Sequence, residues 1–301
     1  MYLDPKNDIA FRKIFGNENK KEILISFLNS ILRLKDKKRI VDIDYSDGRQ
    51  LPKIRELKET ILDVRCTDER GINYIVEMQI ARPSKFEKRA LYYTSKAYIN
   101  QIEVGELYPS LNPVIFIGIL DFEMFENPDY LTYHSIKDEM TGENKLSDFR
   151  FCFIELPKFN KTENEIISVE DKWIYFIKNA KNIAHIPLQV KEHEIKEAYN
   201  ILEKFNWDKH ELEVYDKIGI YRQDERGRVE QGYMEGLEKG EKRGIEQGKQ
   251  IGIEQGKQIG LKEGERTAKL EIARNMLKGG IQYDSIIILT GLTQKELDEL
   301  K

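Results

Sequence analysis

The run NPVIFIGILDF at residues 112–122 limits the fold most, because it is almost wholly apolar. A strand of this kind is expected where helices cover both faces of a sheet. A further strand is predicted at residues 150–156, and helical periodicity dominates residues 166–221. The pattern therefore predicts an α/β domain with a helical subdomain after it.

The amino-terminal part of the chain is predicted to follow an α-β-β-β-α-β order. Asp4 is the expected cap of the first helix, with Pro5 just inside it, and Gly105 is the expected end of the later helix. The predicted elements up to residue 122 are a helical region at 1–33, a strand at 39–46, hairpin strands near 60–67 and 72–80, a helix at 86–105 and the strand at 112–122.

Glycine recurs at every fourth position from Gly232 to Gly264, nine times in all. Four residues turn an α-helix by about 400°, so these glycines wind around the helix and cannot form one straight stripe. Each glycine also costs up to about 1 kcal/mol relative to alanine. We interpret the segment as a poorly packed helical spacer; a GxxxG-type face for self-association is the alternative.

The last segment is predicted to form a helix, a Gly-Gly turn, a short helix, and a final helix that begins at Gln294 with Thr293 as its cap. This arrangement resembles a helix-turn-helix. The final helix is more acidic than basic, which favours a docking or oligomerisation module over a DNA reader. The predicted division is 1–160 for the core, 161–226 for the helical subdomain, 227–266 for the spacer and 267–301 for the tail.

Composition narrows the class of protein less than the motifs do. The 49 basic and 53 acidic residues nearly balance, so net charge does not identify a partner. No apolar stretch approaches the ~18 residues of a membrane helix, and no signal peptide is visible, which predicts a cytoplasmic protein without a membrane partner. Cys66 and Cys152 lie in apolar runs and are expected to be free, buried thiols.

The predicted hairpin carries polar side chains where its strands should be buried. Glu77 and Gln79 point to the same face of their strand because side chains alternate. Asp63 lies on the neighbouring strand, roughly opposite positions 76–79. Two carboxylates side by side repel, and a divalent cation such as Mg²⁺ relieves this repulsion. The alternative is that these three residues occupy the solvated face of an ordinary hairpin.

Four stretches together resemble the PD-(D/E)XK nuclease family transposases, also called recombination-promoting nucleases. They are NDIAFRKIFG, ILDVRCTDERGINYIVEMQ, KRALYYTSKAYINQI and GELYPSLNPVIFIGILDF, in that order. The resemblance covers residues 1 to about 225. It implies a restriction-endonuclease-like core and Mg²⁺-dependent DNA endonuclease activity, with Mn²⁺ as an alternative ion. It also implies a link to recombination, mobile elements or defence.

The resemblance further implies roles for individual residues. Asp63 and Glu77 would be the metal ligands, and the backbone carbonyl of Met78 would supply a third oxygen. Gln79 stands where many superfamily members have lysine, and would orient the attacking water. Asp8 matches an acidic residue of the first helix that some members add to the site.

Contacts to DNA are expected on the helix after the hairpin, where four residues are predicted to share a face. These residues are Arg89, Tyr93, Lys96 and Gln101. Solvated helix positions are the alternative for them. The basic run RLKDKKR is a further candidate for phosphate contact, with a merely solvated charge run as its alternative.

The sequence thus predicts a metal-dependent DNA endonuclease. The main alternative is a catalytically inactive protein that keeps the nuclease fold and binds DNA or another protein. Self-association through the glycine-rich helix or the tail is a further expectation. A structural interaction protein without affinity for nucleic acid is the third interpretation.

Overall fold

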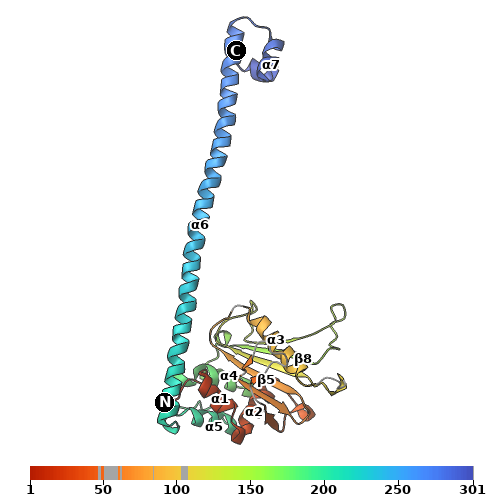
Figure 1. Cartoon of the computed structure of the whole chain (residues 1–301), viewed down its shortest axis with the longest axis vertical. Helices are drawn as coiled ribbons and strands as arrows, with labels where there is room; N and C mark the ends of the chain where they lie inside the picture. The colour runs from red at the N-terminus through yellow and green to blue at the C-terminus, as the bar shows by residue number, and fades with distance from the viewer. Residues whose placement is uncertain (47–48, 51–59, 62, 84, 103–107, 301) are drawn as a thin grey trace. The chain divides into compact units, whose positions relative to one another are not determined.

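The computed structural model describes residues 1–46, 49–50, 60–61, 63–83, 85–102 and 108–300 (Figure 1). The chain divides into two compact units, Met1–Arg226 and Gly227–Lys301. Helix α6 (Lys209–Lys278) contributes residues to both units. The finer boundaries predicted at residues 160 and 266 stay predictions.

A six-stranded mixed sheet forms the middle of the first unit, in the order β1-β4-β5-β6-β8-β7. β5, β6 and β8 run parallel to one another, whereas β4 is antiparallel to β5 and to β1, and β7 is antiparallel to β8. The strands are β1 (Ile43–Tyr45), β4 (Val64–Asp68), β5 (Asn73–Gln79), β6 (Val114–Leu120), β7 (Leu131–Ser135) and β8 (Phe149–Glu155). A separate pair consists of β2 (Arg49–Gln50) and β3 (Thr60–Ile61).

Helices cover both faces of this sheet (Figure 1). On one face lies α3 (Phe86–Ile99), whose Ala90 and Ala97 pack with Ile75 and Phe116 of the sheet. The other face packs in a single large core against α1 (Asp8–Phe15), α2 (Lys21–Ile31), α4 (Val169–Asn179) and α5 (His193–Leu202). All seven residues of β6 are buried, because this strand has helices on both sides.

The predicted α/β class and the α-β-β-β-α-β order through residue 121 are confirmed. The predicted cap of the first helix is wrong. Asn7 caps α1 by accepting a hydrogen bond from the backbone of Ile9 at 3.0 Å, while the Asp4 side chain accepts from Lys6 and closes the preceding turn. Helix α3 ends at Ile99; Gly105, its predicted end, lies outside the described residues.

The second unit contains the later part of α6 together with α7 (Tyr283–Thr290) and α8 (Gln294–Asp298). Ala273, Ile286, Leu292 and Leu297 form its small core. Thr293 caps α8 in a capping box with Glu296, as predicted.

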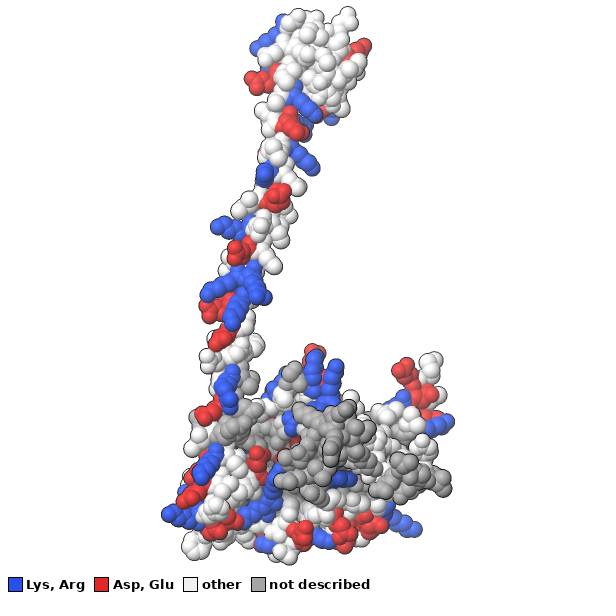
Figure 2. All heavy atoms as spheres, viewed as in Figure 1, with Lys and Arg blue, Asp and Glu red and all other residues white. Residues whose placement is uncertain are grey.

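The glycine repeat lies within α6, which is helical through all nine glycines. A Cβ atom added at any of them would meet no described atom within 4 Å, so no described residue packs closely against them. Acidic and basic side chains are interspersed along this part of α6 (Figure 2), and Lys242 pairs with Glu238 at 2.6 Å, one turn apart. Such pairs offset part of the cost of glycine.

Two further expectations concern the whole chain. Among the described residues, no helix is both long and apolar enough to cross a bilayer. Cys66 and Cys152 are confirmed as free, buried thiols.

Candidate active site

The β4–β5 hairpin places the candidate site because its turn fixes the register of the two strands. The Asp68 carboxylate accepts backbone hydrogen bonds from Arg70 at 2.9 Å and Ile72 at 3.0 Å. Gly71 adopts φ 82°, a left-handed conformation that glycine takes without strain. The resulting register pairs Val64 with Val76, and Asp63, the residue before β4, continues it toward Glu77.

Asp63, Glu77 and Gln79 lie together in the structure. The Met78 backbone N–H donates to Asp63 Oδ2 at 2.8 Å, and the Asp63 N–H donates to Glu77 Oε1 at 3.3 Å. Gln79 Nε2 in turn donates to Glu77 Oε2 at 3.4 Å. The sequence predicted this juxtaposition from side-chain alternation along the second strand and from the pairing that a turn near residues 68–71 imposes on the hairpin.

Glu77 faces α3, on the same side of the sheet as Ile75. In the register of the parallel strands, Glu77 lies beside Gly118 of β6, which lies beside Phe153 of β8. A Cβ atom at Gly118 would come within 2.9 Å of the Phe153 ring. Glycine at this position therefore allows the Phe153 ring to pack over the strand next to the buried carboxyl group.

Burial dominates the electrostatics of both carboxyl groups. Glu77 is only 2% exposed, and burial, reinforced by the nearby Asp63, raises the pKa of its carboxyl group to about 8. Burial also raises the pKa of Asp63, although its hydrogen bond from Met78 and the charges of Arg12 and Arg89 act in the opposite direction. Two neighbouring carboxyl groups that are largely shielded from water are costly when both are ionised.

Two arginines from different helices lie near the pair. Arg12 of α1 approaches Asp63, with Nη2 3.7 Å from Oδ1. Arg89 of α3 lowers the pKa of both Asp63 and Glu77 through its charge, and its Nε donates to the Tyr93 hydroxyl. Arg89 and Tyr93 were named from the sequence, whereas Arg12 was missed.

The sequence feature that could have identified Arg12 as a site residue is its spacing of four residues from Asp8, which is a predicted site residue. Asp8 is the first residue of α1, and Arg12 follows four residues later, so both lie on one face of the helix. That face carries Arg12 to Asp63.

The other two residues predicted to contact DNA, Lys96 and Gln101, lie farther along the chain than Arg89 and Tyr93. Lys96 is buried and lies seven residues after Arg89, about 10 Å along the helix, with its ammonium 6.0 Å from the Tyr92 ring centre. The structure places Gln101 apart from the carboxyl pair. Its amide donates to the Asn112 carbonyl and accepts from the Asn112 N–H, both at 2.9 Å, and so ties the end of the α3 segment to the start of β6.

Comparison with known families gave one long match. The family model described as PD-(D/E)XK nuclease family transposase matches residues 5–232. The chain belongs to this family. The resemblance stated from the sequence motifs is thereby confirmed, and a nuclease- or transposase-related role is supported.

A second family model matches the tail of this PD-(D/E)XK chain. It is described as the Rpn/YhgA-like nuclease family, C-terminal HTH domain, and covers residues 266–301. The helix-turn-helix arrangement predicted from the sequence agrees with it. Searches of curated proteins and of solved structures gave no match.

PD-(D/E)XK nucleases generally use divalent metals. Within the described part of the chain, no group of three or more His, Cys, Asp or Glu side chains forms a metal cluster. The partly buried Asp63 and the buried Glu77 nevertheless lie together, and the pKa of each carboxyl group is raised; a cation would relieve the repulsion between the two ionised groups. Mg²⁺ binds through one or two carboxylates plus water and substrate phosphate. The donor set fits such an ion.

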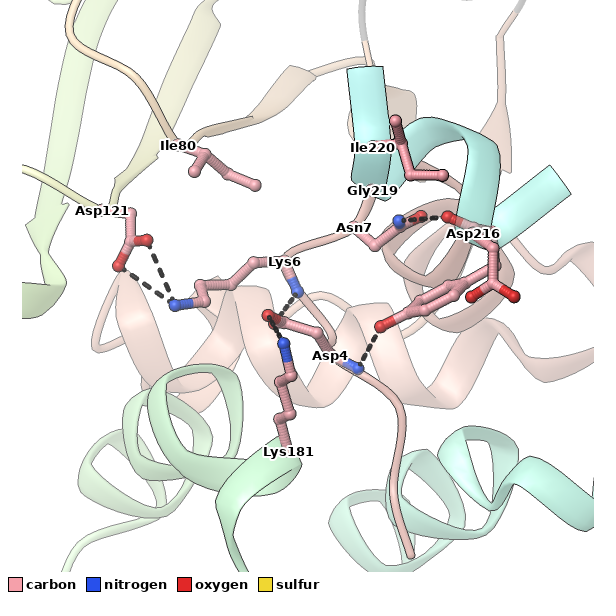
Figure 3. A pocket seen from close by; sticks show the side chains of 10 residues that line it. Asp4, Lys6, Asn7, Ile80, Asp121, Lys181, Asp216, Gly219 and Ile220 are labelled. Atoms are coloured by element: carbon pink, nitrogen blue, oxygen red, sulfur yellow. Dashed lines mark hydrogen bonds and ion pairs between the residues drawn. The ribbon is translucent and has the colours of Figure 1, made fainter. Parts of the chain in front are cut away.

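A pocket of about 670 Å³ opens beside the ends of β5 and β6 (Figure 3). Ile80 and Asp121 line it, and the Asp121 N–H donates to the Gln79 carbonyl at 2.9 Å. Four of its five charged groups form two ion pairs: Lys6 lies 3.1 Å from Asp121, and Lys181 lies 3.8 Å from Asp4. Neither Asp63 nor Glu77 lines this pocket, so it is adjacent to the carboxyl pair but distinct from it.

Proposed function

We propose that this protein hydrolyses phosphodiester bonds of DNA as an endonuclease that requires Mg²⁺, with Mn²⁺ as a substitute. The observation that carries the proposal is the pairing of the partly buried Asp63 with the buried Glu77, held by backbone hydrogen bonds at the start of β4 and the end of β5. Membership of the PD-(D/E)XK family supports the choice of DNA as substrate.

Asp63, Glu77 and the Met78 carbonyl would hold the ion. When bound, the ion would neutralise charge on the phosphate and lower the pKa of a water ligand. The hydrogen bond from Met78 orients Asp63, and the contacts of Glu77 with Asp63 and Gln79 orient the second carboxylate. The protein thus holds its ligands in place before substrate arrives.

In many superfamily members a lysine orients the attacking water and offsets negative charge. In this chain Gln79 and Arg89 together would serve these two functions. An amide orients a water molecule but carries no charge. The Arg89 guanidinium is close enough to lower the pKa of both carboxyl groups, and it would place a fixed positive charge at the reacting phosphate. Asp8 and Arg12, on one face of α1, would position Asp63 and the water from the opposite side.

In the reaction, the water oxygen attacks phosphorus and one P–O ester bond breaks. The leaving oxygen takes up a proton, and the products are a phosphomonoester and a hydroxyl end. Incubation of the full chain with supercoiled plasmid tests this proposal. We expect nicked and linear DNA with Mg²⁺ or Mn²⁺ and unchanged plasmid with EDTA. Plasmid that stays unchanged with Mg²⁺ and also with Mn²⁺ would refute the proposal.

The substitution of glutamine for the superfamily lysine gives some weight to a second function. With Gln79 in that position, the chain would bind DNA or a protein through the retained fold without cutting. The same incubation, combined with a gel-shift measurement, separates the two functions. Metal-independent DNA binding without any cleavage would favour the inactive binding protein.

A further inference from the structure

The basic segment between α2 and β1, residues 32–39, is held rigidly in the structure. Arg33 donates to both carboxylate oxygens of Glu170, at 2.8 and 3.1 Å, and its guanidinium lies 5.5 Å from the Tyr133 ring centre. At the end of the segment, the Asn29 side chain donates to the Ile40 carbonyl at 2.9 Å and accepts from the Ile40 N–H at 2.8 Å. The segment is thus fixed near both of its ends.

The backbone of this segment is also unusual. Arg33 and Asp36 have φ angles of 52° and 50°, a left-handed conformation that costs energy for residues other than glycine. Residues in such conformations persist where the surrounding contacts impose them, and they often lie at binding sites.

A hollow of about 670 Å³ opens over the segment, and Arg150 of β8 joins its wall. Besides Arg33, which pairs with Glu170, five basic residues belong to the segment or the hollow, and we call these five the basic patch: Lys35, Lys37, Lys38, Arg39 and Arg150. The four residues from the segment are exposed, and no described residue forms an ion pair with any of the five. Asp36 is the single acidic residue among those that line the hollow.

The basic patch is separate from the candidate active site. In the sheet register, Arg150 lies beside Ile115, which lies beside Tyr74, three residues before Glu77. That is about 10 Å along the strands and about 10 Å across them. Because side chains alternate along a strand, Arg150 lies on the same face of the sheet as Cys152 and Ile154. Glu77 lies on the opposite face.

The lining of the hollow indicates the kind of ligand. Small-molecule pockets are lined mainly by apolar and aromatic side chains. Six of the eight residues that line this hollow are charged, and five of those six are basic. Such a surface suits repeated phosphates that stay partly hydrated, as along a nucleic-acid backbone.

We propose that the basic patch binds the phosphate backbone of a second stretch of DNA, outside the segment that is cut. This inference rests on the proposed function, because it takes DNA as the substrate of the active site. The patch adds affinity without touching the reacting phosphate. A duplex too short to reach around the sheet gains nothing from it during cleavage.

The test compares two triple variants of the full chain. Lys35→Ala/Lys37→Ala/Lys38→Ala removes three charges of the basic patch. Lys191→Ala/Lys196→Ala/Lys204→Ala removes three exposed lysines near α5 and serves as the matched control. Binding of a fluorescent 40-base-pair duplex is measured by anisotropy at several salt concentrations in EDTA, so that no cleavage occurs. Cleavage of a short duplex at saturating enzyme is measured separately with Mg²⁺.

We expect the patch variant to bind the long duplex about 10-fold more weakly at low salt, with the slope of log affinity against log salt reduced by about 2–3, since each phosphate contact contributes about 0.9. The control variant should match the wild type, and both should cut the short duplex normally. Equal binding by the patch and control variants would overturn the inference. If the wild type still cuts plasmid, that result leaves the proposed function intact.

Two other outcomes would also overturn the inference. The patch variant could lose binding of tripolyphosphate while keeping its affinity for DNA, which would assign the patch to a small polyanion. The wild type could neither bind nor cut DNA, in which case the proposed function fails as well.

Discussion

Asp63→Asn should lower the rate of plasmid nicking by more than about 100-fold, because loss of a direct metal ligand exceeds the 10–100-fold cost of changing a residue that supports one. The substitution keeps the size of the side chain and leaves an oxygen able to accept from the Met78 N–H. The folded structure should therefore survive. Nicking of supercoiled DNA at a fixed Mg²⁺ concentration gives the rate.

Asp44→Asn is the matched control for this experiment. Asp44 lies on β1 of the same sheet, and its side chain is 90% exposed. This variant should nick plasmid as fast as the wild type. If Asp63→Asn also nicks at the wild-type rate, Asp63 has no part in the reaction and the assignment of the site is wrong.

Glu77→Gln should stabilise the metal-free protein above pH 8 while removing its activity. The pKa of Glu77 is raised from 4.5 to about 8 in the folded state. Between these pH values the folded state holds a proton that the unfolded state has lost, so the free energy of unfolding falls as pH rises through this window. A glutamine amide at this position is uncharged at every pH, so the free energy of unfolding of the variant does not fall in this window.

The gain in the free energy of unfolding should reach about 5 kcal/mol at pH 9, because the pKa of Glu77 rises by about 3.5 units and each unit represents 1.36 kcal/mol, and Tm should increase by about 10–20 °C. It should vanish below pH 4.5, where both states of the wild type are protonated. Thermal unfolding in EDTA at pH 4, 6, 8 and 9 measures it, with the exposed Glu139→Gln as control. A gain that does not depend on pH would show that the buried charge of Glu77 is not its cause.

Local patterns in the sequence predicted much of the fold and the centre of the site. Side-chain alternation placed Glu77 and Gln79 on one face, and the turn at Asp68–Gly71 set Asp63 beside them. Continuous apolar runs predicted β6 and β8 because both strands are covered on two sides. These features depend on residues near one another in the chain.

Features that depend on tertiary contacts were missed. Strand β7, with the sequence LTYHS, is half exposed at the edge of the sheet and has no apolar run to reveal it. Arg12 reaches Asp63 only because the fold brings α1 near the start of β4. Gln101 was predicted to continue the helical face of Arg89, but α3 ends at Ile99 and the amide instead binds the Asn112 backbone.

Calorimetric titration of Mn²⁺ into the metal-free protein at pH 8 tests most directly whether Asp63 and Glu77 form an ion-binding pair. We predict saturable binding to the wild type and to Asp44→Asn, and an affinity lower by more than about 100-fold in both Asp63→Asn and Glu77→Gln. Equal affinity in all four proteins would contradict the account, since the ion would then be held elsewhere or only weakly along the surface.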